Sequence, residues 1–438
     1  MRQVGRAPCD TGSNGRTFSR HVIQFLAGIS NVGLQHLRDF DSDAPPPLSQ
    51  SPDGRWFYFL SALKQFVGGE PGAGQIDQGR IGLSSEMTSQ ALEEFLGPFT
   101  YQRICQVIDW MKKDVKRQTE KTESEAGKRS LLKTLHYLFE SENRGLAKVA
   151  VRSVETLSFS GMSLTPIECV VLSQVIGLSD TIKCLDLDRC DIQHESLQWF
   201  GHGLHKCQEL SLVGNKLGDS GVKLVSAALR NPECKIQKLW LEKVDLTASG
   251  VEDLVSALNI NKSLTGLNLS DNNLGDSGVK LLIAALWKPK CNIKKLWLRY
   301  IGLTDSGAED LMPALSTNPS LTELYLSDNK IGDSGVNLVS EALRNPECKI
   351  QKLWLRGVDL TDSGANGLIS ALSTIGSLTE LDLSYNSLTD QFVSALHHFI
   401  LTHPRLMLIW LRCNRFSEIR KKEMKSLGES KYGLQVDI

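Results

Sequence analysis

The sequence predicts an α/β solenoid of horseshoe shape, with parallel strands inside and helices outside, preceded by a small all-α module. The first observation is internal repetition. Three segments that begin at Gly214, Asp271 and Asp328 match almost position for position at a period of 57 residues. Each segment holds two related halves with an L-x-x-L-x-L-x-x-N-x-L type of core. Repetition of this kind indicates units that bury their apolar faces against their neighbours.

The second observation is a regular spacing of apolar residues. From Leu210 onward the second core position recurs at spacings that alternate between 29 and 28 residues, with a final 28. Including the units before Leu210, it occurs ten times, which predicts about ten repeats within residues 151–438. The ten positions are Leu157, Leu185, Leu210, Leu239, Leu267, Leu296, Leu324, Leu353, Leu381 and Ile409.

Each half-repeat begins with a strand and a turn. Leu324 and Leu326 alternate with polar residues, as in a short strand with one apolar face. Asn329 follows at the turn, where an amide side chain can satisfy backbone groups that have no strand partner. We expect the asparagines at this position to form a structural ladder: Asn215, Asn272, Asn329, Asn386 and Asn414.

A helix then follows in each half-repeat. In GDSGVNLVSEAL (residues 332–343) the apolar residues Val336, Leu338, Val339, Ala342 and Leu343 form a helical stripe. The sequence places Asp333 or Ser334 to cap the first turn. In the other half-repeat, Ser249 with Glu252 and Ser306 with Glu309 have the spacing of capping boxes.

The chain before the repeats has a different composition. Residues 1–18 are rich in Gly, Ser, Arg and Asp and are expected to be disordered, and residues 19–150 are expected to form a helical module. A terminal repeat needs a cap, and this module is expected to supply it from residue 56 onward. The expected linkers are 41–54 and 68–82, the expected helices are 56–66, 89–115 and 131–151, and the charged stretch 112–129 is expected to be a solvated helix end or loop.

Composition narrows the class of partner and the compartment. The formal net charge of −1 and pI of about 6.8 argue against nucleic acid and anionic membrane surfaces. No apolar run approaches the roughly 18 residues of a membrane span, and the first 30 residues make a poor secretion signal. Ten cysteines without close CxxC pairs indicate reduced thiols. The expected location is therefore the cytoplasm.

The sequence offers no catalytic, metal or cofactor site. No Ser/His/Asp or Cys/His set can be proposed from spacing, so we expect no enzyme activity, no bound metal and no cofactor. Cys234, Cys291 and Cys348 recur at 57-residue steps just before a strand. This spacing places them two strands apart, about 10 Å, which is too far for a disulfide between them. They are therefore expected to be buried and structural. Cys184 and Cys190 are expected to point into the solenoid.

The candidate binding surface is a ladder of aromatic residues on the inner strands. Trp240, Trp297, Trp354 and Trp410 each lie between two apolar strand residues, so alternation points them to the concave face. Trp and Arg are enriched among residues that dominate protein interfaces. Tyr325 and Asn268 hold the same position on intervening strands, and charged neighbours flank it: Glu242, Arg299, Arg356 and Arg412 on one side, Lys238, Lys295 and Lys352 on the other.

Two interpretations of this ladder remain open. It can be a contact surface for a protein partner, because contiguous exposed aromatics usually mark one. It can also be a habit of the repeat, copied by recent duplication of the 57-residue unit.

The repeats resemble a known class. The halves LWLRGVDLTDSG and LTELDLSYNSLTD, with their 28/29 alternation, resemble leucine-rich repeats of the ribonuclease-inhibitor type. The sequence upstream resembles NLR proteins, the NACHT and leucine-rich-repeat receptors, of the pyrin-containing type. The fragments that carry this resemblance are SRHVIQFLAG (19–28), WFYFLSALKQF (56–66) and LLKTLHYLFESENRGLAKVAV (131–151).

The chain also departs from that family. The nucleotide-binding domain of the family carries a G-x-x-x-x-G-K-[ST] loop, but the nearest string here, GKRS at 127–130, has no upstream glycine at the required position. The chain therefore resembles a C-terminal piece of such a receptor. The resemblance implies a non-catalytic interaction module in cytosolic innate immunity and inflammasome signalling, with a protein partner, including intact NLR receptors, on the concave face. The ladder could equally pack on the receptor's own other domains.

Two further functions are associated with repeats of this type. The ribonuclease inhibitor is similar in its repeats, but it is richer in cysteine and more acidic than this chain. GTPase-activating proteins with this fold end in an acidic tail, whereas this chain ends in KYGLQVDI after a basic KKEMK.

Overall fold

The computed structural model describes residues 112–140, 144–152, 154–286, 288, 291–318 and 320–438. The chain divides into two units, Met1–Val154 and Glu155–Ile438, and each is described by itself. Several expectations lie outside the described residues: the disordered segment 1–18, the linkers 41–54 and 68–82, and the helix at 56–66. Residues 89–111 of the helix expected at 89–115 also lie outside them. The expectation that the first unit caps the second stays a prediction.

The described part of the first unit is helical. Residues 112–119 are helical, and α6 (Glu125–Glu140) and α7 (Arg144–Val151) follow. The charged stretch 112–129 is thus mostly helix, and two helices occupy the region where one was expected. Helix α6 buries Leu131, Leu135 and Leu138, which recur at the spacing of one helical face.

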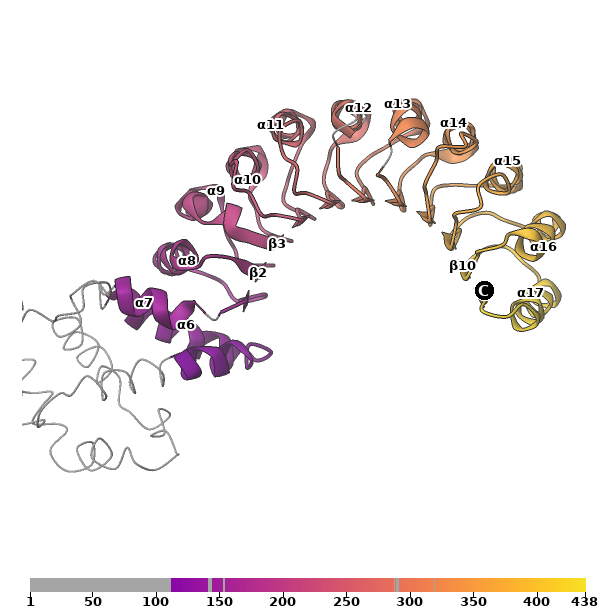
Figure 1. Ribbon diagram of the computed structural model, residues 1–438. Helices are drawn as coiled ribbons and strands as arrows, with labels where there is room; N and C mark the ends of the chain where they lie inside the picture. The colour runs from indigo at the N-terminus through magenta and orange to yellow at the C-terminus, as the bar shows by residue number, and fades with distance from the viewer. Residues whose placement is uncertain (1–111, 141–143, 153, 287, 289–290, 319) are drawn as a thin grey trace, which may run out of the picture. The chain divides into compact units, whose positions relative to one another are not determined.

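The second unit is a solenoid built on one parallel sheet. Within the described residues the sheet has eleven strands in sequence order, so each strand pairs with the strands before and after it. Figure 1 shows the strands on the inner side of an arc. The strands are β1 (Thr156–Ser158), β2 (Ile182–Asp186), β3 (Cys207–Ser211), β4 (Lys238–Trp240), β5 (Gly266–Asn268), β6 (Lys295–Trp297), β7 (Glu323–Tyr325), β8 (Lys352–Trp354), β9 (Glu380–Asp382), β10 (Leu408–Trp410) and β11 (Gln435–Asp437).

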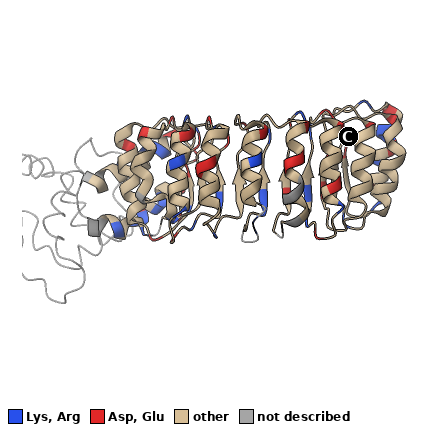
Figure 2. Cartoon of the chain, turned by 90° about the horizontal axis from the view of Figure 1, so that it is seen from above, with Lys and Arg blue, Asp and Glu red and all other residues tan. Residues whose placement is uncertain are grey.

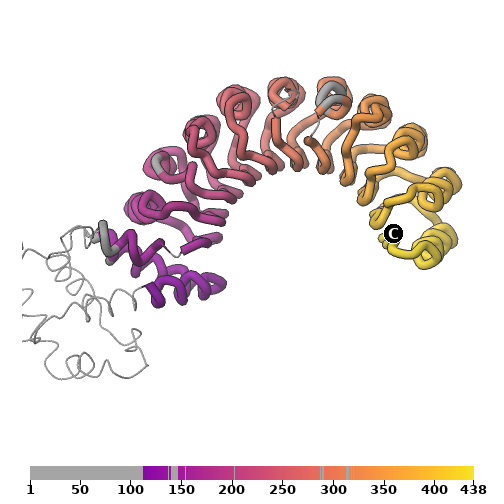
Figure 3. The backbone as a smooth tube through the Cα atoms, viewed as in Figure 1, coloured from indigo at the N-terminus to yellow at the C-terminus, as the bar shows by residue number. Residues whose placement is uncertain are grey.

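Helices cover the outer side of the arc, one layer thick (Figure 3). Because helices are wider than strands, parallel stacking of strand–helix units curves the sheet inward. The outer elements are α8 (Pro166–Leu178), α9 (His194–Leu197), η2 (Gln198–His202), η3 (Leu204–Lys206), α10 (Gly218–Leu229), α11 (Ala248–Leu258), α12 (Gly275–Leu286), α13 (Asp305–Thr317), α14 (Gly332–Leu343), α15 (Asp362–Leu372), η4 (Asp390–Phe392), α16 (Val393–Thr402) and α17 (Glu418–Ser430).

The strand register confirms the predicted alignment of the repeats. Leu239 pairs with Leu267, and Leu296 pairs with Leu324, as the 29/28 spacing requires. All ten predicted core positions lie within β1–β10, one on each strand, at 0–1% exposure. The horseshoe fold class is therefore confirmed.

The last strand was not predicted from the sequence. Strand β11 has no leucine pattern, yet Val436 pairs with Ile409 of β10. Gly428 of α17 allows this approach, because a Cβ there would meet the Val436 side chain at 2.9 Å. The count of ten repeats thus becomes eleven strands.

The predicted helix caps were wrong in detail. Helix α14 begins at Gly332 with no side-chain cap, and Asp333 bonds to Thr361 of the next repeat instead. Thr247, not Ser249, caps α11 by accepting a hydrogen bond from the backbone N–H of Ser249. The capping box in this part of the chain lies elsewhere, at Thr165 and Glu168 of α8.

The asparagine ladder is confirmed in full detail at Asn329. Its Oδ1 accepts hydrogen bonds from the backbone N–H of Ile301 and Leu303, and its Nδ2 donates to the carbonyls of Leu298 and Leu326. Asn329 is 2% exposed, so one side chain satisfies four backbone groups that water cannot reach.

The cysteines follow the predictions only in part. Cys190, Cys291 and Cys348 are buried, but Cys234 is only partly buried. Cys184 was expected to point into the core, yet it pairs with Glu209 on β3 and so lies on the concave side of β2. The eight described cysteines are free thiols, and burial raises the pKa of Cys184 to about 11.

The outer face carries both signs of charge. Figure 2 shows Lys, Arg, Asp and Glu interspersed on the helices rather than gathered by sign. Among the described helices, none is long and apolar enough to cross a membrane.

Candidate functional site

The concave side of the sheet carries one continuous row of aromatic rings. Strand pairing places this position of β4–β11 in a single row, which reads Trp240, Asn268, Trp297, Tyr325, Trp354, Asp382, Trp410 and Asp437. The buried strand residues beside the rings, such as Leu239 and Leu353, are 0–1% exposed. The rings therefore stand on the opposite, solvent-facing side of the sheet, as predicted.

The rings contact one another in a chain, which we call the aromatic stack (Trp240, Trp297, Tyr325, Trp354 and Trp410). Ring centroids are 5.0 Å apart for Trp240 and Trp297, and 5.1 Å for Trp297 and Tyr325. They are 4.7 Å apart for Tyr325 and Trp354, and 5.2 Å for Trp354 and Trp410. These are the separations of favourable aromatic pairs, each of which contributes about 0.5–1.5 kcal/mol beyond area burial.

Two gaps in the row are closed by rings that lean across a short residue. Trp240 and Trp297 stand two strands apart, roughly 10 Å in the backbone, yet their rings are 5.0 Å apart. Asn268, on the strand between them, is consequently only 3% exposed. Asp382 is 7% exposed between Trp354 and Trp410 in the same way. Asn268 was predicted to share the exposed row with Tyr325, but the structure buries it.

Burial raises the pKa of two groups in the row, Asp382 and Tyr325. Removal from water raises the pKa of Asp382, against the lowering effect of its hydrogen bond from the backbone N–H of Ser384. Burial and the hydrogen bond to Glu323 also raise the pKa of Tyr325, so its phenol stays protonated. Burial therefore favours the uncharged form of both groups, Asp382 beneath the stack and Tyr325 within it.

Hydrogen bonds from the ring edges fix part of the stack. Trp240 Nε1 donates to Glu209 Oε1 at 2.9 Å, and the Tyr325 hydroxyl donates to Glu323 Oε2 at 2.9 Å. Trp354 Nε1 is buried and has no partner among the described residues. These two hydrogen bonds fix the orientation of the Trp240 and Tyr325 rings.

One flank of the stack is a row of paired lysines and glutamates. Lys295 Nζ lies 2.9 Å from Glu323, and Lys352 Nζ lies 2.9 Å from Glu380. Lys238 pairs with Glu209 at 3.1 Å. The hydrogen bond to Glu380 raises the pKa of Lys352. The lysines were predicted here, but the glutamates that neutralise them were missed.

The other flank is a row of arginines and aspartates. Asp328 accepts from Arg299 Nε at 2.6 Å and from Arg356 Nη1 at 3.2 Å, and Arg299 also reaches Asp271 at 3.2 Å. The pKa of Arg299 is raised by its bond to Asp328. Arg356 further lies 4.1 Å from the centroid of the Tyr385 ring. Asp328 thus joins the two predicted arginines.

Two predicted site residues have other contacts than expected. Glu242 accepts a hydrogen bond from Asn268 Nδ2 at 3.0 Å, so it supports the floor of the stack. Arg412, at the far end, pairs with Asp437 of the unpredicted strand β11.

The acidic partners could have been found from the sequence. Aligning the half-repeats on Leu296 and Leu324 sets Lys295 beside Glu323, because residues before paired leucines are neighbours across parallel strands. The leaning of rings over Asn268 and Asp382 has no such signal, since side-chain direction depends on the packing of the whole row.

The repeats match known family models. A model described as Leucine Rich repeat matches residues 208–226, 261–282 and 317–339, and a second, described as Leucine Rich Repeat, matches residues 377–399. These residues include strands β5, β7 and β9, most of β3, and much of the helices that follow these strands. The solenoid is therefore a leucine-rich-repeat protein.

Similar proteins narrow the class further. The chain is 45% identical over 188 residues to NACHT, LRR and PYD domains-containing protein 3 of Bos taurus, which covers 43% of this chain and 18% of that protein. It is 44% identical over 195 residues to NACHT, LRR and PYD domains-containing protein 14 of Homo sapiens, covering 44% and 18%. It is 36% identical over 243 residues to the ribonuclease inhibitor of Sus scrofa, covering 55% and 53%.

These similarities support assignment of the chain to the C-terminal leucine-rich-repeat region of NLR proteins. The chain spans about a fifth of the length of the NACHT, LRR and PYD domains-containing proteins that it matches.

Proposed function

We propose that this protein is a non-catalytic binding module of cytosolic innate immunity, which receives a protein partner on the aromatic stack. The observation that carries the proposal is the unbroken contact of five rings on the concave side of the sheet. Trp and Tyr are enriched at interface positions that contribute most to affinity. A contiguous aromatic surface that is already packed loses little side-chain entropy on binding.

The charges beside the stack support an aromatic rather than an electrostatic mode of binding. Lys295 and Lys352 are paired with glutamates of adjacent strands, and Arg299 and Arg356 share Asp328. Charges that are already compensated contribute little long-range attraction. We therefore expect affinity for the partner to depend weakly on ionic strength, unlike an interface steered by net charge.

The place of the module in immunity rests on the named relatives. NACHT, LRR and PYD domains-containing proteins match the repeats at 44–45% identity. We infer a role in ligand sensing or in regulation of inflammasome signalling, with intact NLR receptors among the partners, in the cytoplasm. Repeats of this kind act as binding surfaces, which is consistent with a protein that is not an enzyme.

The test is a quantitative affinity purification with three forms of the chain. The double variant Trp297→Ala/Trp354→Ala removes two rings from the stack, and Trp199→Ala is the control. Trp199 is 50% exposed but lies on η2, among the outer elements. Proteins recovered by the parent and by the control, but depleted at least tenfold by the double variant, would support the proposal. Equal recovery by all three forms would contradict it.

A second candidate is inhibition of a ribonuclease, because the porcine ribonuclease inhibitor is 36% identical over 55% of this chain. The chain's net charge of −1 counts against binding a basic nuclease. Titration of pancreatic-type ribonuclease activity with the protein separates the two functions. Stoichiometric inhibition would establish this second function, and no inhibition at micromolar protein would exclude it.

A further inference from the structure

A second surface follows the loops at the carboxyl ends of the strands. One residue of each loop precedes its buried apolar residue, and these residues form what we call the loop-edge row. Backbone bonds tie the loops together: Asn273 N donates to Leu246 O at 3.1 Å, and Lys330 N donates to Leu303 O at 3.0 Å. The row reads Asp191, Lys216, Asp245, Asn273, Gly302, Lys330, Asp359, Ser387 and Arg415.

The middle 57-residue unit breaks the charge pattern of this row. The first and third units place Lys216 and Lys330 at one position, where the middle unit has Asn273. Gly302 likewise stands where the flanking units have Asp245 and Asp359. The middle unit also differs from its neighbours elsewhere, but on the loop-edge row these two changes stand at adjacent positions. They leave two neighbouring uncharged positions on the row, with exposed Asp245 at one end and exposed Lys330 at the other.

The backbone alone does not explain the glycine. Gly302 has φ +78°, a left-handed conformation, but Asp245 and Asp359 adopt the same region at φ 61° and 60°. Asp and Asn tolerate this region better than most residues. A Cβ on Gly302 would meet its nearest neighbours only at 3.7 Å. Neither backbone conformation nor a close contact therefore requires glycine at this position. Its effect is to leave the space beside the loop free of a side chain.

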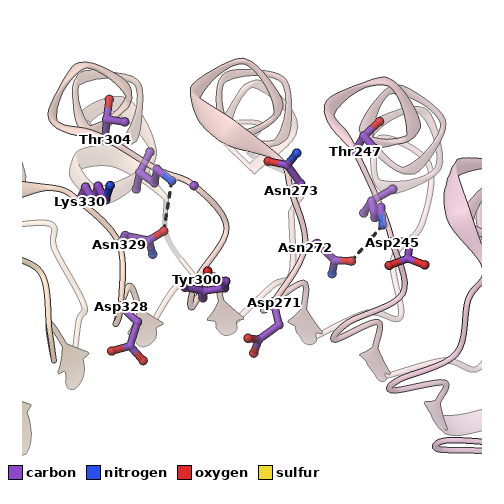
Figure 4. Close-up of a pocket in the computed structure, with 13 residues that line it drawn as sticks. Asp245, Thr247, Asp271, Asn272, Asn273, Tyr300, Thr304, Asp328, Asn329 and Lys330 are labelled. Carbon is purple, nitrogen blue, oxygen red and sulfur yellow. Dashed lines mark hydrogen bonds between the residues drawn. The ribbon is translucent and has the colours of Figure 1, made fainter.

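A cavity of about 700 Å³ occupies this space (Figure 4). Tyr300 lies at its centre and is 65% exposed, where the flanking units have Lys243 and Gly357. Figure 4 shows Tyr300 between Asp271 and Asp328, with Asp245 and Lys330 toward the two ends.

The charges around the cavity are unequally satisfied. Asp271 and Asp328 both pair with Arg299. Within the described part of the chain, neither Asp245 nor Lys330 has an ion-pair partner. The cavity therefore presents one available carboxylate, a neutral aromatic centre and one available ammonium group.

We propose that this cavity binds an extended peptide segment of a partner protein, with a basic side chain at Asp245, an acidic one at Lys330 and uncharged residues across Tyr300. Asp245 and Lys330 follow β4 and β7, three strand steps apart, roughly 14 Å at about 4.8 Å per step. An extended chain advances about 3.3 Å per residue, so its charged residues are about four positions apart. This site is separate from the aromatic stack and does not depend on the function proposed there.

The test uses three labelled peptides and the full chain. The probes are acetyl-Gly-Arg-Ala-Phe-Ala-Glu-Gly-amide, the same peptide with Arg and Glu exchanged, and a neutral form with Gln at both places. Fluorescence anisotropy gives the dissociation constants. One charge order is expected to bind about fivefold tighter than the neutral form, the contribution of two exposed ion pairs. Equal binding of all three peptides would overturn the proposal.

Charge reversal at the two ends gives the sharper result. Asp245→Lys/Lys330→Asp is expected to reverse which charge order binds better. Lys216→Asp/Asp359→Lys makes the same exchanges at the flanking positions and should leave the preference intact. A preference that survives the first variant, or reverses in the second, overturns the proposal.

Restoring the flanking pattern fills the cavity. Asn273→Lys/Gly302→Asp gives the middle unit the residues of its neighbours, which fold with those residues in place. We expect at least a tenfold loss of peptide binding with an unchanged circular dichroism spectrum. Undiminished binding by this folded variant would also overturn the proposal.

Discussion

Asp276 of one repeat holds Thr304 of the next by two hydrogen bonds from one carboxylate. Its Oδ1 accepts from the Thr304 backbone N–H at 2.8 Å, and its Oδ2 accepts from the Thr304 hydroxyl at 2.7 Å. The same arrangement joins Asp219 to Thr247 and Asp362 to Thr389. These aspartates therefore link helix beginnings between repeats, rather than capping their own helices.

Asp276→Ala is expected to destabilise the solenoid by about 1–2 kcal/mol, because it leaves a part-buried backbone N–H unsatisfied and removes a second bond. Urea unfolding followed by circular dichroism measures this. Asp305→Ala is the matched control, since Asp305 is an exposed aspartate at the start of α13. Equal losses in the two variants would show that the link between repeats contributes nothing.

Asn329→Ala should cost more, about 2–4 kcal/mol, because four buried backbone groups lose their partner together. Amide hydrogen exchange at Ile301 and Leu303 should accelerate first, since their N–H groups bond to Asn329. Asn337→Ala, on the exposed side of α14, is the comparison. A loss below about 0.5 kcal/mol at Asn329 would contradict the ladder's role.

Asp382→Asn is expected to stabilise the protein at neutral pH. Burial raises the pKa of Asp382 above its ordinary value of 3.8, so the folded state binds this proton more tightly than the unfolded state. Its contribution to stability is therefore greatest below the unfolded pKa and falls as pH rises through the folded pKa. Asparagine removes that loss while keeping the oxygen that accepts from Ser384 N–H, as Asn268 does for Ser270.

Thermal midpoints at a series of pH values from about 4 to 7 test the sign, since this range begins near the ordinary pKa of an aspartate. The advantage of Asp382→Asn should grow with pH. A constant difference, or one that shrinks toward neutral pH, would mean that Asp382 is not destabilised by burial. Asp305→Asn, at an exposed position, should show no such trend.

Tyr325→Ala should divide the aromatic stack into two separate pairs, because Tyr325 is the ring between Trp297 and Trp354. A double-mutant cycle of Trp297→Ala with Tyr325→Ala should give a coupling of about 0.5–1.5 kcal/mol. Tyr325→Phe keeps the ring and should preserve most of that coupling, although the bond to Glu323 is lost. Additive effects of the two alanine changes would show that the rings do not stabilise each other.

The sequence predicts most of the solenoid because its pattern is repeated. Register follows from Leu239, Leu267 and Leu296, since a buried residue on each strand leaves one possible alignment. Strand β11 escapes this logic, because Val436 belongs to no leucine pattern and the strand is recognised only by its pairing with β10.

The site was predictable in position but not in contacts. Alternation along the strand places Trp240 and Trp354 on the concave side without any structure. Whether a ring leans toward its neighbour depends on the size of the residue between them, and so Asn268 and Asp382 were not recognised as covered. The prediction of Asp333 as a cap was wrong because a cap is inferred from neighbouring residues, whereas the partner of Asp333, Thr361, is 28 residues away.

A periodic surface has a recognition problem, since a partner that fits one unit can slide to the next and dock equally well. On the loop side, Asn273 stands where the flanking units have Lys, and Gly302 stands where they have Asp, which removes that ambiguity. Within the three units, the charge pattern of the loop-edge row changes only at these two adjacent positions. A peptide bound at these positions would therefore take one register and one direction along the solenoid.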